Sequence, residues 1–483
     1  MEVVLSRLKR ISPVWLTFFS SLLLSLIAVV GEVTIGKDGA FYVDLAVTYL
    51  ESGTAATFAR FDWPWFSIIL AIFNRFTGIG LELIAYSLCA LFMAGTCCLL
   101  VDIVVKRLPQ TGYWACLVVL SMPAFNAFRG DVLREYGFWF FSILALWLAM
   151  RWYSHPTWMR ASLVHIAISA AALFRLEAVL LMPALAVWQL VGVRSWADFA
   201  KSVQFNALPA FIGMVALVWV FLGAGLSAER LNDYAELLNP KGISSNFSDA
   251  AENFSKAVLH RFAENDAKHI LLFGLFGSAV FMFIKLLGPF AVPLLFRRGR
   301  EAAGQFFVEF KPFAWAFAFY FAVIMLFYTQ QLFMNSRYIS FLNLLSVPAA
   351  VVSFVWFVGR FPKWGRFFCV LALLVMLDNV LSFSAKKTHY VESGHWIAQN
   401  VKKDASIYYA DPRISYHAGR GYPKQRLNMT AAMSEDHQAR FDYFVIEADA
   451  DEKWLVVWMQ QHNKRVITQF ANRKGDTVLV VGD

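Results

Sequence analysis

The feature that most constrains this chain is a series of long apolar stretches separated by short charged gaps. Hydrophobic residues make up 59% of the 483 residues, whereas soluble domains contain about 45–50%. A stretch of about 20 apolar residues is long enough to cross a bilayer as a helix. The sequence therefore predicts an α-helical polytopic membrane protein.

The charged gaps alternate in sign along the chain. Lys and Arg gather in every second gap, at Arg7, Lys9, Arg10, Lys106, Arg107, Arg151, Arg160, Arg194, Lys201, Arg297, Arg298, Arg300, Arg360, Lys363 and Arg366. The intervening gaps hold Asp38, Asp44, Asp131, Glu135 and Glu177. Short basic loops stay in the cytoplasm, so we expect a cytoplasmic N-terminus and carboxylates on the outer face. The net charge of +9 then indicates topology and contact with membrane lipids, and not nucleic acid.

The hydropathy pattern predicts about eleven spans, and an odd number places the C-terminus outside. The expected limits are 13–31, 82–104, 113–128, 136–152, 161–174, 178–193, 204–226, 270–296, 312–333, 338–358 and 367–384. The spans 161–174 and 178–193 are short for a hydrocarbon core about 30 Å thick. They are predicted to form a tilted or broken pair.

The outer segment 32–81 is predicted to hold juxtamembrane helices. Gly36-Lys37-Asp38-Gly39 opens it as a turn. Apolar residues then recur at helical spacing from Phe41 to Leu50, until Gly53 ends the run. A second segment, 65–73, is too short to span the bilayer. Both are expected to lie at the membrane surface.

The composition changes after Lys386 to that of a small soluble domain. We therefore expect a transmembrane domain over 1–385 and an α/β extracytoplasmic domain over 386–483. Its expected helices are 393–403 and 452–462, and its expected strands are 405–410, 441–446, 465–470 and 477–481, the last two forming a hairpin. The five cysteines all fall in apolar spans, so no disulfide framework is predicted.

Asp38 is the strongest candidate for catalysis. It lies in a glycine-flanked turn directly after the first span, at the start of a predicted helix, where a carboxylate is favoured electrostatically. One interpretation is that it only caps this helix. The other is a general base held at the membrane–water boundary. Lys37 and Tyr42, on either side of it, are candidates for substrate binding.

The turn from Arg129 to Glu135 carries four charges in seven residues. Charges at the lip of two membrane helices are costly, and they tend to pair or to take part in function. The turn is either a salt-bridged link between helices or part of the site. In the second case Asp131 or Glu135 positions the acceptor, while Arg129 and Arg134 hold an anionic headgroup.

Two further outer helix ends repeat this pattern. They hold Arg175 with Glu177, and Arg337 with Tyr338. Arginines on the outer side oppose the positive-inside trend, which indicates a bound anion. A metal is not predicted, because His260, Glu264, Asp266 and His269 match no standard ligand spacing.

With these residues placed, the chain resembles the GT-C membrane glycosyltransferases, in the branch of the protein O-mannosyltransferases and the lipid A aminoarabinose transferases. The likeness runs through about 30–200, 335–350 and 386–425. It rests on the order of several segments, namely GKDGAFYVDLA, WPWFSIILAIFNRFTGIG, CLLVDIVVKRL, RGDVLREYGFWFF, ALFRLEAVLLMPAL, NSRYISFLNLLSVPAA and HWIAQNVKKDASIYYADPRISYHAGR.

The resemblance implies an inverting glycosyltransferase that moves a hexosyl or pentosyl group from a polyprenyl-phosphate donor to an acceptor hydroxyl on the outer face. The acceptor is a lipid, a glycan or a protein. Asp38 matches the family's catalytic aspartate, and Asp131 matches its second acidic position. Some members carry Glu directly after the first Asp, where this chain has Gly39, which argues against a protein acceptor of the mannosyltransferase type. No cofactor is expected.

Two other classes of protein share the apolar spans. A transporter or flippase of lipid-linked sugars would show matched broken helices in two halves, which this sequence lacks. A membrane scaffold that displays the C-terminal domain would leave the charged outer turns without a role. The absence of cysteine from the outer segments favours the inner membrane of a bacterium, with a periplasmic C-terminal domain.

Overall fold

The structure is a computed structural model that describes residues 11–221, 240–381, 385–423 and 427–483. The predicted basic N-terminus at 7–10 and the end of the predicted span 204–226 lie outside these residues. The chain divides into two compact units. Unit 1 consists of Met1–Ser25, Cys89–Arg129 and Arg134–Val380, and unit 2 consists of Leu26–Leu88, Gly130–Leu133 and Leu381–Asp483.

Unit 1 is built from helices. They include α6 (Gly112–Ser121), α7 (Pro123–Asn126), α8 (Glu135–Ser154), α9 (Trp158–Phe174), α10 (Leu181–Val191), α11 (Trp196–Phe221), α13 (Pro240–Val258), α14 (Ala267–Leu287), α15 (Arg297–Ala303), α16 (Phe306–Glu309), α17 (Lys311–Gln331), α18 (Ser336–Arg360) and α19 (Pro362–Leu381). Two more helices, α2 (Pro13–Gly31) and α5 (Leu81–Arg107), contribute residues to both units.

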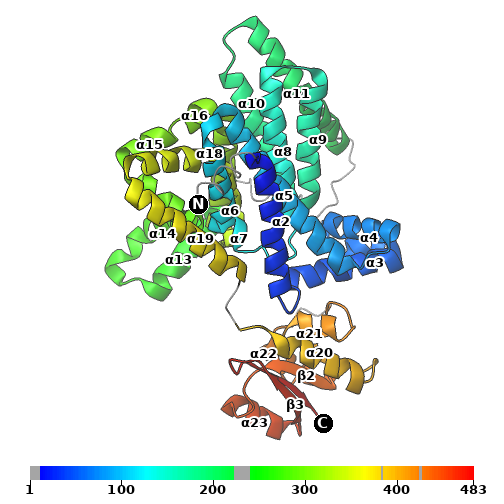
Figure 1. Cartoon of the computed structure of the whole chain (residues 1–483). Coiled ribbons are helices and arrows are strands. Elements are labelled where there is room, and N and C mark those ends of the chain that lie inside the picture. The colour runs from blue at the N-terminus through cyan, green and yellow to red at the C-terminus, as the bar shows by residue number, and fades with distance from the viewer. Residues whose placement is uncertain (1–10, 222–239, 382–384, 424–426) are drawn as a thin grey trace. The chain divides into compact units, whose positions relative to one another are not determined.

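Helix α18 lies at the centre of unit 1. Leu344, Val347, Val351 and Phe354 on it are all fully buried, and α6, α14, α15 and α17 pack against it. A second group of helices is formed by α8, α9 and α11, which run side by side in Figure 1. This packing fixes the ends of α8, α9 and α18, where the predicted charged residues lie.

Six described helices are long and apolar enough to cross a membrane, and three shorter apolar helices accompany them. The polytopic membrane fold predicted from the sequence is thereby confirmed. The predicted span 113–128 is not one helix, because α6 ends at Ser121 and α7 begins at Pro123. Proline disfavours a helical conformation in the residue before it, and Met122 is accordingly extended.

The short predicted pair 161–174 and 178–193 is a broken pair in the structure. Helix α9 ends at Phe174, Arg175 is extended, and a 3-10 turn over Leu176–Leu180 leads into α10. Between the predicted spans 204–226 and 270–296, the polar segment Pro240–Val258 forms the helix α13. Its apolar residues recur at helical spacing, which gives the helix one apolar face.

Unit 2 contains the predicted juxtamembrane helices. Helix α3 (Lys37–Arg60) is interrupted at Gly53, whose φ of 78° lies outside the helical region. The helical run therefore breaks at the predicted glycine, although a further helical turn follows it. Helix α4 (Trp65–Thr77) ends at Gly78, which adopts a left-handed conformation, and α4 packs against α3.

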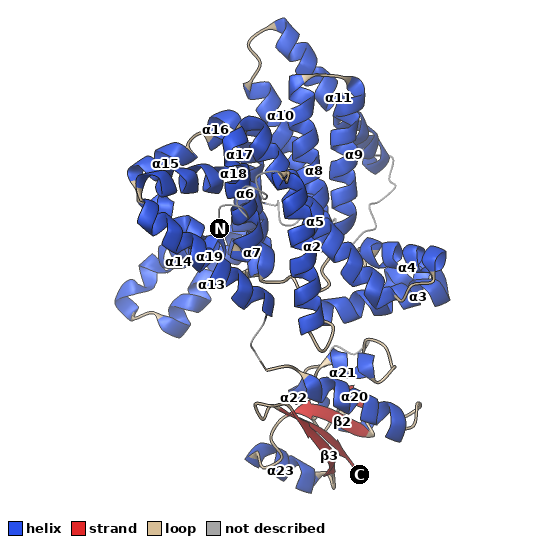
Figure 2. Cartoon of the chain, in the orientation of Figure 1, coloured by secondary structure: helices blue, strands red, loops and turns tan. Residues whose placement is uncertain are grey.

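The C-terminal part of unit 2 is an α/β fold. Its strands are β1 (Ile407–Tyr409), β2 (Tyr443–Glu447), β3 (Arg465–Ala471) and β4 (Thr477–Gly482). They form one sheet in the order β1-β2-β4-β3 (Figure 2). Strands β1 and β2 are parallel, whereas β3 and β4 form the predicted antiparallel hairpin.

Helices cover both faces of this sheet, because successive strand residues point to opposite sides. Phe444 and Ile446 face one core that includes Trp458 of α23 (Lys453–Gln461). Val445 faces the other core, which includes Ile397 of α20 (Thr388–Asn400). The helix α21 (Pro412–His417) follows β1 and contacts both α20 and α3.

Candidate functional site

Several of the predicted site residues belong to two groups of charges, one in each unit. We call Glu135, Arg175, Glu177 and Arg337 the α8 cluster, and all four belong to unit 1. We call Lys37, Asp411 and Arg413 the α21 cluster, and these belong to unit 2 together with Asp38 and Asp131.

The α8 cluster gathers three helix ends. Glu135 is the first residue of α8, Arg175 follows the last residue of α9, and Arg337 lies in the first turn of α18. A carboxylate is favoured at a helix N-terminus and a cation at a C-terminus, so Glu135 and Arg175 suit their positions. Arg337 does not, because the N-terminus of α18 carries partial positive charge. A nearby anion would offset this.

Arg175 is the hub of the α8 cluster. It donates from Nη1 to Glu135 Oε1 at 2.9 Å and from Nε to Glu177 Oε2 at 3.3 Å. Nη2 also donates to Glu177 Oε1. Its guanidinium carbon lies 4.5 Å from the centre of the Tyr338 ring. The arginine is therefore held by two carboxylates and one aromatic face.

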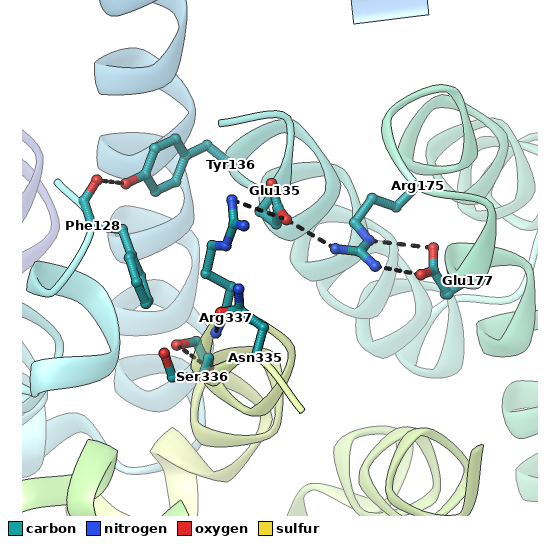
Figure 3. A network of polar contacts seen from close by, with 9 residues as sticks. Phe128, Glu135, Tyr136, Arg175, Glu177, Asn335, Ser336 and Arg337 are labelled. Carbon is teal, nitrogen blue, oxygen red and sulfur yellow. Dashed lines mark hydrogen bonds and ion pairs between the residues drawn. The ribbon is translucent and has the colours of Figure 1, made fainter. Parts of the chain in front are cut away.

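Glu135 lies between two arginines, as Figure 3 shows. Arg337 Nη1 is 4.0 Å from Glu135 Oε1, which is the long limit for an ion pair. Oε2 of Glu135 is buried and receives no hydrogen bond in the described structure. A buried carboxylate oxygen without a donor is costly. Glu135 thus makes a short hydrogen bond to Arg175 and a longer ion pair to Arg337.

Arg337 is the more accessible arginine of the α8 cluster. Its side chain is 22% exposed, compared with 8% for Arg175. Asn335 Oδ1 accepts a hydrogen bond from the Arg337 backbone at 3.0 Å and so caps α18. The cap fixes the backbone of Arg337 at the start of α18.

Arg129 and Arg134 occupy different environments. Arg129 is buried and donates from Nε to Asn126 Oδ1 at 2.9 Å, and from Nη1 to Ser21 Oγ and Ser25 Oγ at 3.0 Å each. These contacts tie α2 to the turn before α8 and favour a structural role. Arg134 is half-buried and lies within electrostatic reach of Glu177.

In unit 2, Asp38 is the second residue of α3. It is half-buried, and its charge acts on the phenol of Tyr422. Asp131 lies against the same turn, because a Cβ on Gly36 would sit 2.7 Å from Asp131 Oδ1. The two predicted acidic positions therefore meet at one turn, around Gly36.

Lys37 and Tyr42 both have partners within unit 2. Lys37 Nζ lies 3.0 Å from Asp411 Oδ2, and about half of the lysine side chain is exposed. Tyr42 is buried, with its ring centre 5.4 Å from that of Phe66 on α4. Their predicted role in substrate binding stays a prediction.

Asp411 and Arg413 were not singled out from the sequence. The segment Ala410-Asp411-Pro412 has the pattern of a helix start, with Asp as N-cap and Pro in the first turn. That pattern predicts α21, but it gives no sign that Asp411 pairs with Lys37, which lies near the other end of the sequence. Within the residues described, no group of three or more His, Cys, Asp or Glu side chains could hold a metal ion.

Comparison with known proteins gives structural matches only. No protein-family model matches the sequence, and a search of curated proteins finds no match. The chain is similar to ArnT from Cupriavidus metallidurans, an aminoarabinose transferase solved in its apo state, with 14% identity, a TM-score of 0.56 and coverage of 97% of both chains.

The archaeal oligosaccharyltransferase from Archaeoglobus fulgidus is also similar. Its complex with zinc and sulfate has 13% identity and a TM-score of 0.53, over 89% of this chain and 68% of that one. Its apo form has 12% identity and a TM-score of 0.52, over 90% and 69%. ArnT and the archaeal oligosaccharyltransferase are both GT-C glycosyltransferases. The chain thus has the fold of the GT-C membrane glycosyltransferases.

Proposed function

We propose that this protein is an inverting glycosyltransferase that uses a polyprenyl-phosphate-linked sugar and acts at the outer face of the membrane. The observation that carries the proposal is the meeting of Asp38 and Asp131 at one turn, in a chain with the GT-C fold. A fold alone does not fix a function, so the reaction is assigned from the chemistry of these side chains.

Asp38 acts as the general base in this proposal. The acceptor hydroxyl attacks the anomeric carbon from the face opposite the phosphate, and its proton passes to the Asp38 carboxylate. The bond between the anomeric carbon and the phosphate oxygen breaks, so the configuration inverts and polyprenyl phosphate leaves. Asp131, on the other side of Gly36, orients the acceptor hydroxyl.

Within unit 1, Arg337 is the residue proposed to bind an anionic group of the substrate. A guanidinium suits such a group because its donors form a planar fork. Arg337 is the more exposed of the two arginines of the α8 cluster, which supports this role. Arg175, held by two carboxylates, fixes Glu135 in place.

Transfer by the purified protein in liposomes tests the proposal. Radiolabelled polyprenyl-phosphate sugars would be supplied with an extract of membrane lipids and glycans as acceptors. Asp38→Asn should lower the rate by about 10²–10⁴-fold, the usual contribution of a general base. Glu51→Gln is the matched control, since Glu51 is an exposed carboxylate of the same helix α3, and it should leave the rate unchanged.

Two outcomes would contradict the proposal. Unchanged transfer by Asp38→Asn would remove the base assignment. Movement of the lipid-linked sugar across the bilayer, without transfer to any acceptor, would identify a flippase instead of a transferase.

A further inference from the structure

The C-terminal α/β fold contacts the turn that carries Asp38 at several points within unit 2. Lys37 Nζ lies 3.0 Å from Asp411 Oδ2. On the other side of Gly36, Thr34 Oγ1 lies 2.7 Å from His417 Nε2. Asp411 caps α21 and His417 is its last residue. The two ends of the short helix α21 therefore contact the residues on both sides of Gly36, namely Thr34 and Lys37.

Asp411 is a buried carboxylate that pairs with cations. It is buried, and Arg413 donates to it from Nε at 2.9 Å and from Nη2 at 2.7 Å. Although burial alone would raise its pKa, the hydrogen bonds and charge of Arg413, together with Lys37, keep the pKa of Asp411 below its ordinary value. A buried carboxylate with two cations has a fixed position, because loss of either cation is costly.

Further contacts fix α21 and the residues after it against α3 and the first turn of α5. Tyr416 donates from its hydroxyl to Glu82 Oε2 at 2.9 Å. The ring of Tyr422 lies 5.1 Å from that of Phe41, and Arg60 Nη2 lies 3.5 Å from the Tyr422 carbonyl oxygen. These contacts leave α21 little freedom to slide along α3.

The opposite side of the turn is closed by the segment 130–133. A Cβ on Gly39 would lie 2.9 Å from the Val132 Cβ, and one on Gly36 would lie 2.7 Å from Asp131 Oδ1. Real Cβ atoms do not approach another Cβ so closely, so Gly39 is needed for this fit, whereas the Asp131 carboxylate could turn away from a Cβ on Gly36. The turn is therefore clamped between the segment 130–133 and α21.

We propose that Asp411 is a positioning residue for the Asp38 turn, and that it acts through Lys37. In this proposal Asp411 does not touch substrate. It anchors the side chain next to Asp38 and so fixes the direction of the Asp38 carboxylate. The kinetic part of the inference rests on the proposed function, whereas the structural part does not. A misplacement of about 1 Å at a reacting group can lower a rate by about 10²-fold.

The kinetic test compares Asp411→Asn, Lys37→Met and the double variant in the transfer assay. Asparagine still caps a helix, so α21 should persist. Each single variant should lower kcat about 10- to 100-fold with KM unchanged, and the double variant should be no worse than either single one. Lys37→Arg should restore most of the rate. Asp451→Asn, an exposed acid of the same fold, should have no effect.

The structural test measures hydrogen exchange of the Ala40 amide, which donates to the Gly36 carbonyl at 2.9 Å. Exchange should become faster in Asp411→Asn and in Lys37→Met, and stay unchanged in Asp451→Asn. This readout needs no transfer, so it remains decisive if the proposed function fails. Unchanged exchange in both variants would overturn the inference. Loss of transfer in Lys37→Met alone would also overturn it, because Lys37 would then bind substrate directly.

Discussion

The α8 cluster of unit 1 and the α21 cluster of unit 2 both neutralise a buried charge, but the charge has the opposite sign in the two clusters. In the α8 cluster, one deeply buried arginine is shared by two carboxylates, Glu135 and Glu177. In the α21 cluster, one buried carboxylate is shared by two cations, Lys37 and Arg413. The two clusters therefore differ in how their most exposed cation is held. In the α8 cluster, Arg175 pairs with both carboxylates, and the more exposed Arg337 lies 4.0 Å from Glu135. In the α21 cluster, the exposed Lys37 lies 3.0 Å from the buried Asp411.

The largest expected effect comes from removing, in each cluster, the buried arginine that pairs with the carboxylates. Arg175→Met removes the cation from the buried Glu135 and the half-buried Glu177. Breaking a buried pair in this way costs about 3–5 kcal/mol of the free energy of unfolding. Arg413→Met should cost less, about 1.5–3 kcal/mol, because Lys37 and the backbone amide still reach Asp411. Chemical denaturation in detergent measures both.

Each unit offers a separate signal for this measurement. Cys97 and Cys116 are buried in unit 1, so their reaction with a thiol reagent reports the opening of unit 1. Hydrogen exchange of β2 and β4 reports unit 2. Equal losses for Arg175→Met and Arg413→Met would show that the number of partners does not matter, and the comparison between the clusters would fail.

An intermediate effect is expected from pH in unit 2. Burial, together with the charges of His395 and Arg413, lowers the pKa of His417 in the fold. The ring therefore stabilises unit 2 fully above the ordinary histidine pKa of about 6.5, and this contribution is lost as the pH falls through the lower folded value. Between pH 7 and 5 the free energy of unfolding of unit 2 should fall.

His417→Gln tests this assignment by removing the titrating ring beside Thr34. The dependence of unit 2 stability on pH should become shallower in this variant. It should not vanish, because burial also lowers the pKa of His389 in the same fold. An identical slope in the variant and the wild type would exclude His417 as the group responsible.

The smallest effect on stability is expected for Arg337→Gln. Its ion pair with Glu135 is long and its side chain is partly exposed, so its loss should cost less than about 1 kcal/mol. Transfer should nevertheless fall by about 10²–10³-fold if this arginine binds an anionic group of the substrate. A large loss of stability with normal transfer would place Arg337 in the structural core of the α8 cluster, together with Arg175.

Local sequence signals predicted much of the fold because they depend on neighbouring residues. Helical spacing that ends at Gly53 predicted the break inside α3. The short apolar segment 441–446 and the expected hairpin of 465–470 with 477–481 correspond to β2, β3 and β4. The span expected at 113–128 was wrong in its interior, since hydropathy does not register the break that Pro123 imposes.

The candidate site was predictable only in part. The sequence pointed to Asp38, Asp131 and the outer arginines because charges beside membrane spans are costly and therefore conspicuous. It did not show that Glu135 and Glu177 are the anions that hold Arg175. Nor did it show that Arg129 bonds to the serines of α2.

By itself, the sequence determined the membrane character, the helix and strand types, and the short list of charged turns, because each follows from hydropathy and spacing over a few residues. Only the tertiary structure decided which charges pair. Lys37 and Asp411 are separated by most of the chain, and no local pattern encodes their meeting. Their ion pair results from tertiary packing, because a buried carboxylate pairs with a cation that the fold places close to it.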